Sequence, residues 1–174
     1  KTAGTSLSDV LSPYALKPSA SRWNKIASDA GLVNDWRRFH FRKHASLRKA
    51  ESVLPREIYT SYFKFAFVRN PWERLLSWYQ YVQNTPGHAD RKNGEPFADF
   101  ATRFIGKKRR AQWWMLEDSH GAMGLDCVGR FEQLDDDIGR LCKILDIPFN
   151  ALPHHNKMSK KDYRLHYDQG LADA

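Results

Sequence analysis

A chain of 174 residues is long enough for one domain with its own hydrophobic core and short for two. Its 41% of hydrophobic and 13% of aromatic residues exclude a disordered protein, and no stretch reaches the roughly 18 apolar residues of a membrane helix. The net charge of +8 favours an anionic partner: a phosphorylated cofactor, an acidic polysaccharide, nucleic acid or an anionic membrane. Cys127 and Cys142 form no zinc motif, and we expect two buried thiols.

The chain opens on "KTAGTS", Lys1 to Ser6, a lysine followed by small and hydroxylated residues around one glycine. Glycine lets a backbone approach an anion, and the helix that we expect over 5–12 would point its first N–H groups at that anion. The alternative is a simple N-terminal cap, in which Thr5 or Ser6 only caps the start of the helix and binds no ligand. The segment is not GxxxxGK[ST], because its lysine precedes the glycine, which argues against a kinase or an ATPase.

A second short helix is predicted within 19–32, and a densely basic segment follows it over 36–49. This segment is either a solvated basic face or one wall of an anion site. Its cations and histidines are Arg37, Arg38, His40, Arg42, Lys43, His44, Arg48 and Lys49.

The segment from Tyr62 to Val68 is aromatic, β-branched and almost continuously apolar, which is typical of a buried strand in a mainly parallel sheet. Asn70 is a good helix cap, Pro71 suits the first helical position, and Glu73 stands at the capping-box position. Arg69 therefore lies at the carboxyl end of a strand, where open α/β sheets bind their ligands. The helix has an apolar stripe of Leu75, Leu76, Tyr79 and Val82.

The rest of the chain alternates polar turns with amphipathic segments. Trp113 and Trp114, beside Gln112, could line an acceptor site or belong to the core, and we favour the core. In chain order we expect an exposed loop over 85–95, a core-facing helix over 96–105, a basic cluster over 107–110, a strand over 126–131, a helix over 135–145 with the stripe Ile138, Leu141, Cys142 and Leu145, and a polar, aromatic tail from 153.

Four motifs occur in order: "KTAGTS", "FKFAFVRNPWERLLSWY", "VGRFEQLDDDIGRLCKILDI" and "HHNKMSKKDYRLHYD". In this order the chain resembles the Golgi-type carbohydrate sulfotransferase family, close to its bacterial members and to the heparan sulfate 2-O-sulfotransferase branch. The resemblance implies one sulfotransferase domain over 1–174 with an α/β, P-loop-like three-layer fold. Its central, mainly parallel sheet would be flanked by helices, as in nucleotide kinases, without a metal. By the same resemblance we expect the first strand, before Lys1, and the last helix, after Ala174, to be missing.

The resemblance also implies the ligands. The donor would be 3′-phosphoadenosine 5′-phosphosulfate (PAPS) and the acceptor a carbohydrate hydroxyl. Arg69 and Ser77 match the arginine and serine that hold the donor's 3′-phosphate; their alternative roles are a structural ion pair and a helix-surface serine. Lys1 would also stabilise charge on the bridging oxygen. The 5′-phosphosulfate would be held by Lys1, Thr2, Ala3, Gly4, Thr5 and Ser6.

For the general base, His44 lies where the 2-O-sulfotransferase branch has its histidine, and an ordinary histidine accepts protons near neutral pH. A surface histidine is the alternative. His40 is the second choice, and Glu51 is the candidate if the base is a carboxylate. In the tail, His155 and Lys157 either contact donor or acceptor or belong to a solvated basic segment.

An acidic glycan would suit the basic segments, and we expect no nucleic acid partner and no membrane contact within the chain, although the family is membrane-associated. The compartment would be cytoplasmic in a bacterium and the Golgi lumen in a eukaryote, and the oligomeric state stays open. Two other hypotheses remain: a nucleotide kinase-like phosphotransferase, and a non-catalytic binder of acidic glycan or nucleic acid.

Overall fold

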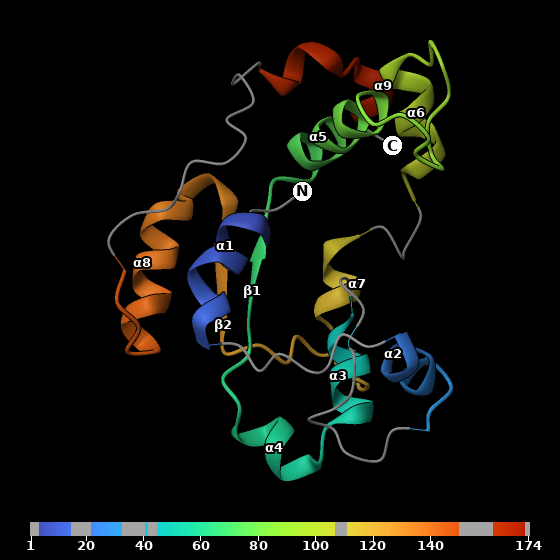
Figure 1. The fold of residues 1–174 in the computed structure, drawn as a ribbon. Helices are drawn as coiled ribbons and strands as arrows, with labels where there is room; N and C mark the ends of the chain where they lie inside the picture. Colours follow the sequence, from blue (N-terminus) through green and yellow to red (C-terminus); the bar gives the residue numbers. More distant parts are fainter. Residues whose placement is uncertain are drawn as a thin grey trace. The chain divides into compact units, whose positions relative to one another are not determined.

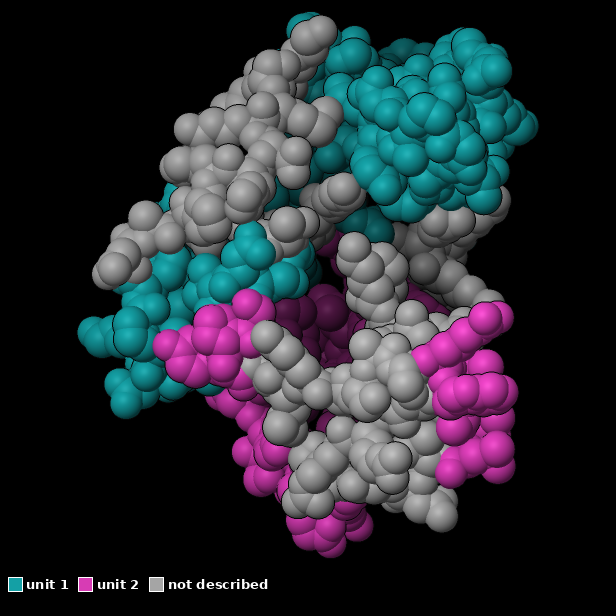
Figure 2. All heavy atoms as spheres, viewed as in Figure 1, with its two compact units in different colours: residues 1–10, 67–110, 129–174 teal, residues 11–66, 111–128 magenta. Residues whose placement is uncertain are grey.

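The computed structural model describes residues 4–14, 22–32, 41, 45–106, 111–149 and 162–172 (Figure 1). The chain divides into two compact units, one of 1–10, 67–110 and 129–174 and one of 11–66 and 111–128 (Figure 2). The elements are α1 (Gly4–Leu11), η1 (Ser12–Tyr14), α2 (Arg22–Asp29), α3 (Leu47–Val53), α4 (Arg56–Ser61), β1 (Phe65–Val68), α5 (Pro71–Gln83), α6 (Phe97–Phe104), α7 (Gln112–Leu116), β2 (Cys127–Arg130), η4 (Phe131–Gln133), α8 (Leu134–Ile144), η5 (Tyr163–His166) and α9 (Gln169–Ala172).

Strands β1 and β2 pair in one small parallel sheet. Their register brings together residues that are 62 positions apart in the chain. Just before the strands, for example, the Lys64 N–H donates to the Asp126 carboxylate at 2.6 Å. This hydrogen bond holds the pKa of Asp126 below its usual range. The parallel pair agrees with the predicted α/β class, whereas the three-layer and kinase-like details stay predictions.

The first strand is shorter and less buried than the sequence predicts. Tyr62 does not begin it, because its N–H donates to the Ile58 carbonyl at 3.1 Å and so ends α4. Tyr62 and Phe63 are 47% and 38% exposed, and the strand from Phe65 onward is half-buried.

In the first unit, α5 packs on α6 through the apolar stripes that the sequence predicts. Leu76, Val82 and Phe100 are buried there, with Phe97, Ala101 and Phe104 beside them. The loop over 85–95 is not wholly exposed, because the carboxylate of Glu95 forms a 2.6 Å ion pair with Arg103 and its side chain is 7% exposed. Arg103 also donates to the Asp90 carbonyl at 3.0 Å, so the loop is fastened to α6.

A second cluster in the same unit joins α1, β1 and α8. Ile138 and Cys142 are its buried centre, and Leu7, Val10 and Phe67 pack against them. Cys142 is buried, which confirms the prediction for this thiol, and its burial raises the pKa of the thiol. Cys127 is only half-buried, so the sequence prediction is wrong for that thiol.

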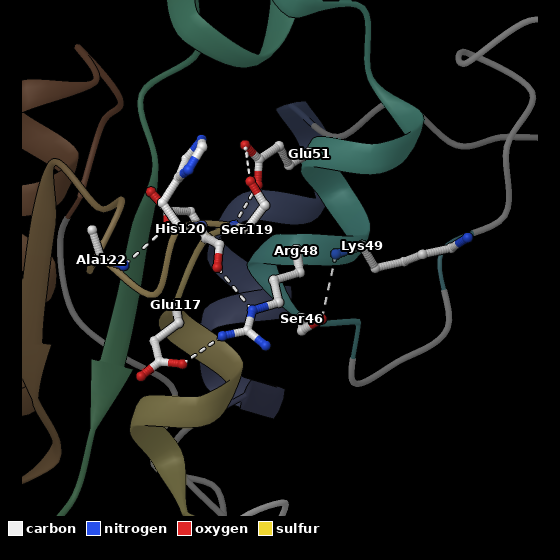
Figure 3. A network of polar contacts seen from close by, with 9 residues as sticks. Ser46, Arg48, Lys49, Glu51, Glu117, Ser119, His120 and Ala122 are labelled. Atoms are coloured by element: carbon white, nitrogen blue, oxygen red, sulfur yellow. Dashed lines mark hydrogen bonds and ion pairs between the residues drawn. The ribbon is translucent and has the colours of Figure 1, made fainter.

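The second unit is held together by polar contacts between α3 and the turn after α7 (Figure 3). Arg48 donates to the Glu117 carboxylate at 2.7 Å and to the Asp118 carbonyl at 2.8 Å. Arg48 therefore has structural partners, although its side chain is still 39% exposed. Trp113, which we expected in the core, is 44% exposed. None of the described helices is long and apolar enough to span a membrane.

Candidate functional site

The residues predicted for the site divide by what the structure describes. Gly4, Arg69 and Ser77 are described in full, and Thr5 and Ser6 are described as helix backbone. Residues of the prediction that lie outside the described ranges are Lys1, Thr2, Ala3, His40, His44, the cluster 107–110, His155 and Lys157.

Helix α1 begins at Gly4, within the predicted phosphate-binding segment. The first N–H groups of an α-helix have no acceptor inside the helix, and they carry the positive end of its dipole. Gly4 is exposed, and, its chain neighbours and its own helix backbone aside, a Cβ placed on it would meet none of the described residues within 4 Å. Further along, Leu7 and Val10 fasten α1 to the cluster around Ile138. The described part of α1 thus combines an exposed first residue with packing further along the helix.

Arg69 follows β1 directly and is held on two sides. Its guanidinium lies over the Phe131 ring at 4.3 Å, and its Nε lies 3.4 Å from the Glu73 carboxylate. The ion-pair role that we considered is therefore present, with a long distance between its partners. The Arg69 side chain is 16% exposed and lines an open cavity of about 420 Å³. The lining residues are Val68, Arg69, Asn70, Arg130, Glu132 and Gln133.

The start of α5 offers no backbone donor to a ligand. The Asn70 side chain accepts from the N–H groups of Trp72 and Glu73 at 3.0 and 3.3 Å, and Pro71 has no N–H. The Arg74 N–H donates to the Asn70 carbonyl at 2.9 Å. An anion beside the start of α5 would therefore find these N–H groups of the helix already bonded.

The predicted capping box is wrong in one partner. The N–H of Asn70 donates to the Glu132 carboxylate at 2.6 Å, across the register of the sheet, and not to Glu73. Glu73 is turned to Arg69 instead. The cap residue itself is confirmed.

Ser77 is 8% exposed, so the surface-serine alternative is wrong. It stands one helical turn after Glu73, and residues four apart lie on the same side of a helix. Arg69, which contacts Glu73, therefore lies on the side of α5 that carries Ser77.

The motif "DYRLHYD" packs against the first turn of α5. Asn70 donates to the Tyr163 hydroxyl at 3.4 Å, and the Tyr167 hydroxyl donates to the Trp72 carbonyl at 2.8 Å. The rings of Trp72 and Tyr167 meet edge to face at 5.3 Å. Burial raises the pKa of Tyr167, and the neighbouring Tyr163 adds to the shift. These tyrosines support the segment that carries Arg69.

Sequence reasoning missed Phe131 and Glu132 as part of this site. The available signal was the register: both residues follow the second strand just as Arg69 and Asn70 follow the first, and parallel strands end at one edge. Arg130, the last residue of β2, lines the same cavity with an exposed side chain and was missed for the same reason.

Glu51, the carboxylate alternative for the base, has a structural partner. It accepts from the Ser119 N–H at 2.7 Å and from the Ser119 hydroxyl at 3.0 Å (Figure 3). Among the described residues, no three histidine, cysteine or carboxylate side chains gather as metal ligands would. The expectation of a metal-free reaction stays a prediction.

Comparison with known proteins gives one match. The model of a family described as the sulfotransferase family matches residues 1–170. No curated protein and no solved structure matches the chain.

Proposed function

The chain belongs to the sulfotransferase family, and we propose that it moves a sulfuryl group from PAPS to a hydroxyl of a carbohydrate. Sulfotransferase families typically use this donor. The carbohydrate acceptor rests on the resemblance of the four motifs to the Golgi-type branch. An acidic glycan is the acceptor that best suits the net charge of +8.

One observation carries the proposal. The exposed start of α1 and the strand before Arg69 pack into the same cluster, since Leu7, Val10 and Phe67 all contact it. Two segments about 60 residues apart thus belong to one compact unit. One anion-binding element uses helix N–H groups and the other uses a guanidinium, which suits a nucleotide with phosphates at both its 5′ and 3′ positions.

Different residues bind the two phosphorylated ends of the donor. Lys1 and the backbone from Thr2 to Ser6 hold the 5′-phosphosulfate. Arg69 holds the 3′-phosphate, to which a guanidinium can donate two parallel hydrogen bonds, and Ser77 adds its hydroxyl.

The donor supplies the sulfuryl group and departs as adenosine 3′,5′-bisphosphate. His44 accepts the proton of the attacking hydroxyl, a role that histidine side chains can take at neutral pH. The Lys1 ammonium stabilises the negative charge that builds on the bridging oxygen. Catalysis then comes from positioning, charge stabilisation and one base.

The test is a transfer assay with ³⁵S-labelled PAPS and a panel of glycans, run on the wild type and on His44→Ala. We expect label on at least one glycan without added metal, and we expect His44→Ala to bind adenosine 3′,5′-bisphosphate normally while losing turnover. Absence of transfer to every glycan, together with magnesium-dependent consumption of ATP, would overturn the proposal in favour of a phosphotransferase. Unchanged turnover in His44→Ala would remove the histidine base alone.

A further inference from the structure

The register of β1 and β2 continues beyond the ends of the strands. Phe67 lies beside Gly129 within the sheet, Arg69 lies over Phe131, and the Asn70 N–H donates to Glu132, each pair again 62 positions apart. Cross-strand partners of this kind stabilise one another through their side chains. The sheet therefore dictates which residue lies under the guanidinium of Arg69.

Phe131 and Glu73 restrain different parts of that guanidinium. The Arg69 Cζ lies over the Phe131 ring, 4.3 Å from its centroid, and the Glu73 carboxylate contacts Nε at 3.4 Å. A free arginine side chain has many rotamers, and binding an anion in one geometry costs the entropy of the others. A guanidinium already held by a ring has less entropy to lose.

We propose that Phe131 is a positioning residue that presets the Arg69 guanidinium for the 3′-phosphate of the donor. The inference rests on the proposed function, because it needs Arg69 to bind that phosphate. Phe131 does not touch the nucleotide itself; its ring acts only by holding Arg69.

The experiment compares two nucleotides by calorimetry on the full chain: adenosine 3′,5′-bisphosphate and 5′-AMP, which lacks the 3′-phosphate. In Phe131→Leu, which removes the ring face, we expect affinity for the bisphosphate to fall about three- to tenfold, as loss of a cation–π contact implies. Affinity for 5′-AMP should not change. Phe131→Tyr, which keeps the ring, should restore the wild-type ratio.

Two controls separate positioning from folding. Phe63→Leu makes the same change at a half-exposed ring in the second unit and should alter neither affinity. Thermal unfolding should show the Phe131 variants folded, because that ring is only half-buried; Phe131→Met gives a second ring-free variant. If Phe131→Leu and Phe131→Met lose affinity for both nucleotides equally, the role of Phe131 is merely structural and the inference is overturned.

The Arg69→Ala background decides what has failed. If Phe131 acts through Arg69, adding Phe131→Leu to Arg69→Ala causes no further loss of bisphosphate affinity. A further selective loss would mean that the ring contacts the nucleotide directly, which contradicts positioning. If Arg69→Ala keeps the wild-type preference for the bisphosphate, the proposed donor site fails; if only Phe131→Leu keeps it, the inference alone fails.

Discussion

Helices α1 and α5 begin in opposite ways. The start of α1 is exposed at Gly4, with N–H groups that have no acceptor in the helix. The start of α5 is closed: Asn70 caps two N–H groups, Pro71 has none, and the Asn70 N–H itself donates to Glu132. Both helices belong to the same compact unit.

From this difference we infer that the unit would bind its two anionic groups in physically distinct ways. At α1 the backbone N–H groups and the helix dipole would attract an anion, and a small residue at Gly4 would let it come close. Beside α5 the N–H groups of the first turn are already bonded, and the proposed ligand is the guanidinium of Arg69, which contacts Phe131 and Glu73. Substitutions at the first turn of α1, at the first turn of α5 and in the packing beside them test this difference.

The largest effect is expected for Arg69→Ala. A guanidinium–phosphate pair is worth about 2–3 kcal/mol, so affinity for adenosine 3′,5′-bisphosphate should fall by roughly a hundredfold. Arg69→Lys, which keeps the charge and loses the two-pronged contact, should lie between. Calorimetry measures both, and an unchanged affinity in the alanine variant would remove Arg69 from the site.

The next largest effect is expected for Gly129→Ala, which disturbs the packing of β1, the strand that leads to α5 and contacts the cluster under α1. A Cβ there would approach the Phe67 ring to 2.4 Å, and Phe67 also contacts the cluster that anchors α1. We expect the free energy of unfolding to fall by about 2 kcal/mol in urea titration. The matched control is Gly139→Ala in α8, whose Cβ would meet Phe149 at an ordinary 3.6 Å. Helix propensity predicts that the control is neutral or slightly more stable, and equal losses in both would contradict the register described here.

Gly4→Ala tests the open start alone. In the part of the chain that the structure describes, the new methyl group meets no atom within 4 Å apart from its chain neighbours and its own helix backbone, so the free energy of unfolding should not fall. A side chain where the backbone must approach the 5′-phosphosulfate should nevertheless weaken donor binding about tenfold. Loss of stability with normal binding would show that Gly4 is a structural glycine instead.

Asn70→Ala tests the closed start. It removes the acceptor for the Trp72 and Glu73 N–H groups and the donor to Tyr163, and should cost about 1–2 kcal/mol in unfolding free energy. Asn70→Asp keeps the capping oxygen and should recover most of this loss. If alanine costs nothing, the start of α5 is not held as described.

Tyr167→Phe should have the smallest effect near neutral pH, up to about 1 kcal/mol for the lost hydrogen bond to the Trp72 carbonyl. The pH dependence is more informative. Burial raises the pKa of Tyr167 above its ordinary value near 10, so the folded state keeps this proton longer than the unfolded state. Its contribution is complete below pH 10 and is lost as the pH rises through the raised value. Urea titrations from pH 8 to 11 should show a flatter decline in Tyr167→Phe than in the wild type.

Local patterns predicted the parts of this site that depend on neighbours in the chain. The Asn70 cap, the proline after it and the apolar stripe of α5 need only a few consecutive residues, and all are observed. The acceptor of the Asn70 N–H was mispredicted because Glu132 is 62 positions away and only the strand register brings it there.

Burial followed the same division. Ser77 stands beside the buried Leu76, yet the helix pattern alone does not tell whether a serine faces solvent or protein. The packing of Tyr163 and Tyr167 on α5 was equally invisible, since their partners lie more than 90 positions away. The prediction for Trp113 was wrong in the other direction: the residue was expected to be buried and is exposed. Hydrophobicity alone does not ensure that other residues cover a side chain.

We propose that the unit binds one nucleotide through the backbone of α1 and through the side chain of Arg69. The most direct measurement is ¹⁵N NMR of the full chain titrated with 5′-AMP and with adenosine 3′,5′-bisphosphate. We expect both nucleotides to shift the amide signals of Gly4 to Leu7, and only the bisphosphate to shift the Nε–H signal of Arg69 as well. A bisphosphate titration that moves neither signal, or one in which 5′-AMP moves Arg69 and leaves Gly4 unchanged, would contradict it.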